Sequence, residues 1–149
     1  VGKTQNKVFK MGIDEYVSRI GHYIPFSIII IPELKNTKSL SEEQQKQKEG
    51  ELILKEIHPG DTVVLLDEHG MELRSVEYAK WLKQKQNIAR RLVFIIGGPY
   101  GFSPNIYARS NEKISLSRMT FSHQMVRLIF TEQLYRACTI IKGEPYHHE

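Results

Sequence analysis

Apolar residues recur at two different spacings along the chain, and the two spacings predict helices and strands in alternation. The run from Phe26 to Ile31 is mostly β-branched and ends at Pro32, which predicts a strand. Before it, apolar side chains recur at the spacing of one helical face. These residues are Phe9, Ile13, Tyr16, Val17 and Ile20.

The rest of the chain continues this alternation without a linker, a repeat or a low-complexity segment. A capping box of Ser39 with Glu42 predicts the start of a helix that runs to about Ile57. Ser103, before Pro104, and Ser122 are placed to cap two later helices. The other predicted elements are a turn over 58–61, buried strands over 62–67 and 92–96, and a helix near 75–85 between them. The pattern predicts one α/β domain over residues 1–149 with a mainly parallel sheet flanked by helices.

The last eight residues, 142–149, place aromatic and titratable side chains at the chain end. Gly143 and Pro145 end the preceding helix, so we expect Tyr146, His147 and His148 to project as a short exposed tail. Such a tail can touch a substrate, although a disordered end is the alternative.

Composition narrows the class of protein. With 40% hydrophobic residues, a chain of 149 residues can form one domain with a hydrophobic core. No apolar run has the length of a membrane span and no signal peptide is recognised, so we expect a soluble, cytoplasmic protein. The single cysteine, Cys138, lies among apolar residues and is predicted to be a core residue. The net charge of +4, which a homodimer would double to +8, is compatible with a polyanionic partner.

A glycine-rich loop, 97–103, follows the predicted strand at 92–96. Its spacing fits neither the dinucleotide motif nor the phosphate-binding loop, so phosphate cradling is poorly supported. Glycines at a strand end can bring backbone close to a flat ligand, and an ordinary tight turn is the alternative.

This loop, the stretch SLSRMTFSHQMVRLIFTEQLYR (115–136) and the terminal YHHE (146–149) together resemble a family of small methyltransferases. Its members modify N3 of a pseudouridine in bacterial large-subunit ribosomal RNA and belong to the SPOUT superfamily. The resemblance spans almost the whole chain. It implies a SPOUT-type domain with a C-terminal trefoil knot and S-adenosylmethionine as methyl donor. It assigns the cofactor pocket to Leu66, Gly97, Leu116, Ser117, Arg118, Met119, Thr120 and Phe121.

The resemblance also implies three catalytic residues. Arg136 would stabilise the developing anion or grip phosphate, with a surface ion pair as the alternative. His147 is equally compatible with a general base and with a residue that only positions RNA. Tyr146 could stack on a base. We interpret His123 as structural, in a helix cap or lining the pocket, with a substrate contact as the alternative.

Several other polar residues are explained without a catalytic role. We interpret Asp67-Glu68-His69-Gly70 as a turn at a strand end, with Asp67 bordering the cofactor. The adjacent histidines and Glu149 lack a spaced third ligand set, so no metal is predicted. Relatives often carry Arg or Lys at the position of His148, which puts a phosphate-binding role of His148 in doubt. At the position of Tyr100 they often carry an acidic residue, so we expect the Tyr100 side chain to be dispensable. Relatives usually open with an apolar strand, so we expect a strand before Val1 to be missing.

The partners follow from the same resemblance. They are ribosomal RNA in the assembled ribosome and a second copy of the chain. A homodimer is also expected because the final helix is strongly apolar, with Met125, Val126, Ile129, Phe130, Cys138 and Ile140. Two alternatives stay open: a non-catalytic RNA-binding or ribosome-associated module, and a SPOUT methyltransferase acting on another nucleotide.

Overall fold

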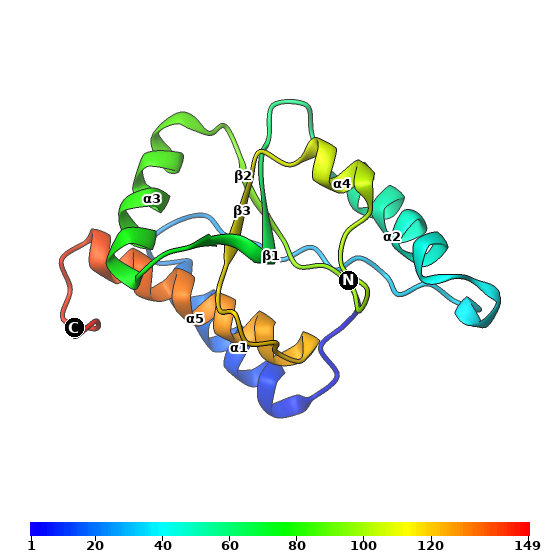
Figure 1. Ribbon diagram of the computed structural model, residues 1–149. Helices are drawn as coiled ribbons and strands as arrows, with labels where there is room; N and C mark the ends of the chain where they lie inside the picture. The colour runs from blue at the N-terminus through cyan, green and yellow to red at the C-terminus, as the bar shows by residue number, and fades with distance from the viewer. The chain divides into compact units, whose positions relative to one another are not determined.

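The computed structural model describes residues 1–149, which form two compact units. The first unit comprises residues 1–3, 29–71 and 89–118, and the second comprises residues 4–28, 72–88 and 119–149. Helices and strands alternate along the chain (Figure 1), which confirms the predicted α/β class. The single domain over residues 1–149 stays a prediction.

The first unit is built on a three-stranded sheet in the order β2-β1-β3. These strands are β1 (Thr62–Glu72), β2 (Leu92–Ile95) and β3 (Glu112–Ser115). β1 and β2 are parallel, with Val63 opposite Val93 and Leu65 opposite Ile95, as the apolar runs predict. The sequence analysis missed β3, because a four-residue strand with Ile114 as its one apolar residue gives a weak periodic signal.

Two helices accompany the sheet in this unit, α2 (Glu42–Glu56) and α4 (Pro104–Arg109), and they lie side by side in Figure 1. The capping box of α2 is Ser41 with Gln44, so the predicted Ser39 and Glu42 pair is wrong. Ser39 instead ends the 3-10 turn η1 (Thr37–Ser39), which carries the chain into the helix two residues later. Ser103 and Pro104 begin α4 as predicted.

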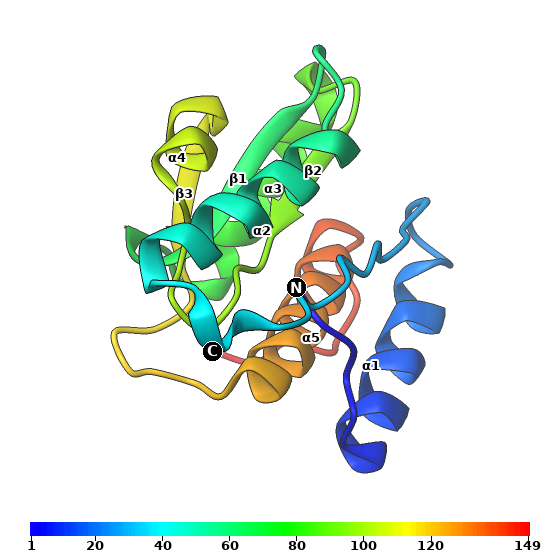
Figure 2. The ribbon, with the colours of Figure 1, turned by 90° about the vertical axis from the view of Figure 1, so that its right-hand side faces the viewer.

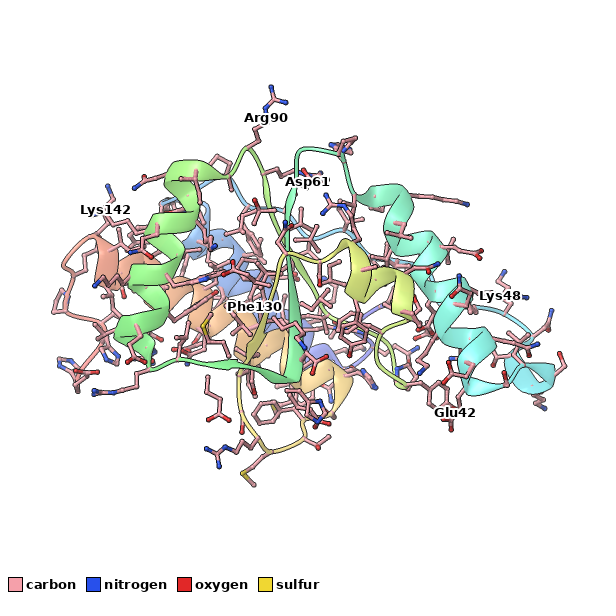
Figure 3. All side chains as sticks on the ribbon, turned by 45° about the horizontal axis from the view of Figure 1, so that its top comes forward. Glu42, Lys48, Asp61, Arg90, Phe130 and Lys142 are labelled. Atoms are coloured by element: carbon pink, nitrogen blue, oxygen red, sulfur yellow. The ribbon has the colours of Figure 1, made fainter.

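The core of the first unit joins α2, the sheet and the start of α4. Its buried members are Ile53, Val63, Leu65, Ile95, Phe102 and Ile106. On α2, Lys48 is exposed (Figure 3), whereas the next residue, Glu49, is only 4% exposed. Its Oε1 accepts a hydrogen bond from Gln45 Nε2 at 3.2 Å, whereas its Oε2 is buried without a hydrogen-bond partner, which is unusual for a carboxylate.

The predicted strand from Phe26 to Ile31 is wrong. The segment is not part of a β-ladder, and Gly2 N donates a backbone hydrogen bond to Ile31 O at 2.8 Å. Ile28, Ile29 and Ile30 are each about half exposed. β-branched composition favours an extended backbone, but a strand also requires a hydrogen-bonded neighbour.

The second unit consists of α1 (Lys7–Ile20), α3 (Ser75–Ile88) and α5 (His123–Ile141). α5 packs against both other helices, and Figure 2 shows it beside α1. A Cβ added at Gly12 of α1 would lie 2.8 Å from Leu128 of α5, so the glycine permits this close approach. Phe130, labelled in Figure 3, is buried, and Cys138 is a free, buried thiol, which confirms its prediction as a core residue.

Candidate active site

The C-terminal tail folds back onto α5 rather than projecting from it. Gly143 takes a φ of +70°, a left-handed conformation that suits glycine at a helix end, and Glu144 N donates to Thr139 O at 3.0 Å. Tyr146 and His147 are consequently half-buried. The prediction that both are exposed is wrong, because the tail finds hydrogen-bond partners on the helix that precedes it.

One carboxylate on α5 organises the predicted catalytic residues. Glu132 Oε1 accepts a hydrogen bond from Arg136 Nη2 at 2.6 Å and another from the Tyr146 hydroxyl at 3.0 Å. Arg136 Nη1 lies 3.1 Å from His147 Nδ1. The structure therefore brings together Arg136, Tyr146 and His147, which we call, with Glu132, the tail cluster.

Sequence reasoning missed Glu132. The available signal was the spacing of Glu132 and Arg136, four residues apart on one helix, which places opposite charges on the same face. What the sequence did not show is that Tyr146 returns to the same carboxylate. Arg136 does form an ion pair, the alternative considered for it from the sequence. The pair is not at the surface, because the side chains of Arg136 and Glu132 are only 24% and 19% exposed.

Aromatic packing holds Tyr146 in the tail cluster. Its ring lies edge-on to Tyr135, with centroids 4.7 Å apart, and the Arg136 guanidinium lies 4.8 Å from the Tyr146 centroid. Burial, followed by hydrogen bonds with Tyr16 and Glu132, raises the pKa of the Tyr146 hydroxyl. At neutral pH Tyr146 is therefore a donor to Glu132 and not a base.

Further contacts tie down both ends of the tail. The Tyr23 hydroxyl donates to Glu144, and Arg74 pairs with the terminal Glu149 at 2.9 Å. His123, predicted to be structural, is exposed at the first position of α5, where Ser122 supplies the cap by accepting from Met125 N.

The residues assigned to the cofactor divide between the two units. In the first unit, the β1–β2 pairing ends with Leu65 opposite Ile95. Leu66 is the next residue of β1, and Gly97 lies two residues after the end of β2. Leu116, Ser117 and Arg118 follow β3, the neighbour of β1 on its other side. Met119, Thr120 and Phe121 belong to the second unit, in the segment that leads into α5.

The glycine loop has a crowded side, which faces the core of its own unit. A Cβ added at Gly97 would lie 3.0 Å from the Phe102 ring, and one added at Gly98 would collide with the Glu49 carboxylate. Gly101, with φ of +82°, closes the loop through its N–H to Gly98 O at 3.2 Å. The glycines thus let backbone pack directly against Phe102 and Glu49.

The prediction of a turn at Asp67-Glu68-His69-Gly70 is wrong, because β1 continues through Glu72. Gly70 lies where β3 approaches so closely that a Cβ would be 2.6 Å from the backbone of Ile114. Asp67 accepts from the Tyr107 hydroxyl at 2.5 Å and from His69 N at 2.8 Å. Burial opposes ionisation of Asp67, but these hydrogen bonds lower its pKa overall.

The remaining features concern a metal site, a membrane span and two polar side chains. No group of three or more His, Cys, Asp or Glu side chains is arranged to hold a metal ion. None of the helices combines the length and the apolar character needed to cross a membrane. Tyr100 and His148 are exposed.

Comparison with known proteins decides the class of enzyme. A family model described as "Predicted SPOUT methyltransferase" matches residues 1–147. The chain belongs to the SPOUT methyltransferases. This membership makes it an enzyme, a methyltransferase, and confirms the resemblance seen in the glycine loop and the SLSRMT stretch.

Curated relatives align over the full chain. Ribosomal RNA large subunit methyltransferase H of Phocaeicola vulgatus is 65% identical over 150 aligned residues, covering 100% of this chain and 96% of that protein. The proteins of the same name from Bacteroides fragilis and Flavobacterium johnsoniae are 62% and 55% identical, with the same two coverages.

Proposed function

We propose that this SPOUT methyltransferase transfers a methyl group from S-adenosylmethionine to N3 of a pseudouridine in the large-subunit ribosomal RNA of the assembled ribosome. The observation that carries the proposal is the tail cluster, in which Glu132 holds Arg136 and Tyr146 while Arg136 contacts His147. The names of the relatives support ribosomal RNA as the substrate. With ribosomes as substrate, the protein acts in the cytoplasm.

The residues assigned to S-adenosylmethionine suit that ligand. Leu66 and Leu116 are half-buried apolar side chains, and Gly97 offers backbone without a side chain. This combination matches a ligand with a flat apolar adenine and polar edges. The pocket would also include Ser117, Arg118, Met119, Thr120 and Phe121, in a C-terminal trefoil knot. When bound, the cofactor supplies an electrophilic methyl carbon on its sulfonium group.

The tail cluster supplies what the acceptor requires. The imide nitrogen of pseudouridine becomes nucleophilic only as its proton leaves, so a fixed cation nearby lowers the energy of the developing anion. Arg136 is such a cation, and its bond to Glu132 and its contact with the Tyr146 ring hold its plane in one orientation. Pre-organised charge of this kind costs no rearrangement during the reaction.

A two-fold homodimer is part of the proposal, with the partner copy completing each active site. Phe130 and Cys138 of α5 are buried, whereas Met125, Val126 and Ile129 remain partly accessible. Sedimentation at working concentration should therefore give twice the mass of the chain. A fully active monomer would contradict this part.

The function is tested with ribosomes from cells that lack the protein. Incubation with purified enzyme and S-adenosylmethionine carrying a labelled methyl group should label one pseudouridine of the large-subunit RNA, at N3. A label on another nucleotide would support a SPOUT methyltransferase of different target. Binding to ribosomes without any transfer, and no S-adenosylmethionine binding by calorimetry, would identify a non-catalytic module.

A further inference from the structure

The contact between Arg136 and His147 determines which ring nitrogen carries a proton. Arg136 Nη1 lies 3.1 Å from His147 Nδ1. A guanidinium stays protonated and only donates, so Nδ1 must accept with its lone pair. A neutral imidazole with a free lone pair on Nδ1 carries its hydrogen on Nε2.

The other side of the ring agrees with this assignment. His147 Nε2 is buried without a hydrogen-bond partner, and Glu149 Oε1 lies 3.9 Å from it. An acceptor therefore faces the nitrogen that carries hydrogen, and a donor faces the nitrogen that lacks it. Both charged neighbours of His147 have ion-pair partners of their own. Arg136 is paired with Glu132, and Glu149 is paired with Arg74.

A buried donor without a partner is costly, and a substrate could supply the partner. Glu149 shields this side of the ring, and its ion pair with Arg74 is largely exposed, with side chains 47% and 73% accessible. Exposed ion pairs contribute little to stability, so Glu149 can move away from Nε2 at small cost.

We propose that His147 donates a hydrogen bond from Nε2 to a carbonyl oxygen of the acceptor base, and that Arg136 is the positioning residue that fixes this tautomer. The proposal rests on the proposed function, since it concerns an imide nitrogen flanked by two carbonyl groups. As the imide loses its proton, negative charge spreads onto the carbonyl oxygens, where an N–H donor stabilises it.

This role excludes His147 as the base, because the nitrogen that can turn toward the substrate already carries hydrogen. The imide proton passes to water. The nitrogen lone pair then forms the bond to the methyl carbon while the sulfur–carbon bond breaks, and its electron pair stays on sulfur. The sequence is compatible with a base or a positioning group at His147, and the proposal makes this residue a hydrogen-bond donor.

The tautomer is tested directly on the free protein. Nitrogen-15 NMR of the full chain at neutral pH should show hydrogen on Nε2 and none on Nδ1 of His147. In Arg136→Met the fixed preference should disappear, while His22, exposed beyond the end of α1, keeps its own spectrum. Hydrogen on Nδ1 in the unmodified protein would overturn the proposal, whatever the enzyme's activity.

Methyl transfer to undermethylated ribosomes in single turnovers tests the donor role. Glutamine places an N–H near the position of Nε2 but cannot act as a base, so His147→Gln should retain a rate within about tenfold of the original, with an unchanged pH profile. His147→Ala should lose roughly a hundredfold, the usual effect of removing one such donor. His147→Gln as slow as His147→Ala would overturn the proposal.

The experiments distinguish a failure of the proposed function from a failure of the donor role of His147. If the unmodified protein transfers no methyl group to ribosomes, the proposed function is wrong, and the NMR result still decides the tautomer. If it transfers methyl groups at N3 but His147→Gln is inactive, only the donor role is wrong. His22→Gln is the matched control, because it removes a histidine from an exposed position outside the tail cluster.

Discussion

The two units of this protein carry their chemistry in different parts of the chain. In the helical unit, charged and aromatic side chains define the tail cluster, from Glu132 on α5 to His147 in the tail. In the sheet unit, backbone defines the glycine loop, because Gly97 and Gly98 leave no room for a side chain beside Phe102 and Glu49. Substitutions in the first should change turnover, and substitutions in the second should change cofactor affinity and stability.

The largest effect is expected from removing residues 145–149. This deletion takes away Tyr146 and His147 but leaves α5 and the whole sheet unit intact. Methyl transfer to ribosomes should fall by about a hundredfold or more, while S-adenosylmethionine affinity by calorimetry stays nearly unchanged. A shortened protein that transfers methyl groups at the normal rate would show that the tail cluster is not catalytic.

Substitutions of Arg136 and Glu132 test which side chains of the helical unit determine the rate of methyl transfer. Arg136→Ala should be slower than Arg136→Lys, and lysine should still fall short because it lacks the planar fork that reaches Glu132 and His147 together. Glu132→Gln keeps an acceptor oxygen but loses the charge, so we expect roughly a tenfold loss of rate. Single-turnover rates at saturating ribosomes provide the measurement. Equal rates for Arg136→Ala and Arg136→Lys would show that the geometry of the guanidinium is irrelevant.

The sequence predicted the elements better than their ends and partners. Long periodic segments such as α1 and β1 were found, because their apolar faces pack in the core of their own unit. The strand expected at Phe26 to Ile31 failed because pairing depends on a neighbour that local pattern does not specify. The tail cluster was found in part: its three predicted members came from family motifs, whereas Glu132 became visible only through the fold of the tail.

The glycine loop provides a test in the sheet unit. Gly98→Ala forces a methyl group against the Glu49 carboxylate, which should lower the free energy of unfolding by about 1–3 kcal/mol and weaken S-adenosylmethionine binding. Glu49→Ala removes the obstacle, so the double variant should recover part of this loss. Urea denaturation and calorimetry measure both quantities. Strict additivity of the two substitutions would mean that the close approach of Gly98 to Glu49 is not what limits the loop.

The smallest expected effect is the loss of one hydrogen bond between a tyrosine and a carboxylate, and each unit contains such a bond. Tyr23 donates to Glu144 in the helical unit, and Tyr107 donates to Asp67 in the sheet unit. The bond to Glu144 for Tyr23, and burial followed by the bond to Asp67 for Tyr107, raise each pKa from 10.0 to about 12.

Both hydroxyls hold their proton more tightly in the folded state, so each bond is fully effective below pH 10 and is lost as the pH rises toward about 12. The urea midpoint should therefore decrease as the pH rises from 10.0 to about 12. Tyr107→Phe should lower stability at pH 8 by less than about 1 kcal/mol and should make that decrease shallower. Tyr23→Phe should have a smaller effect on this decrease, because its partner Glu144 is exposed to solvent, whereas the Asp67 side chain is only 7% exposed. A steeper fall in either variant would show that the hydroxyl does not stabilise the folded state in its protonated form.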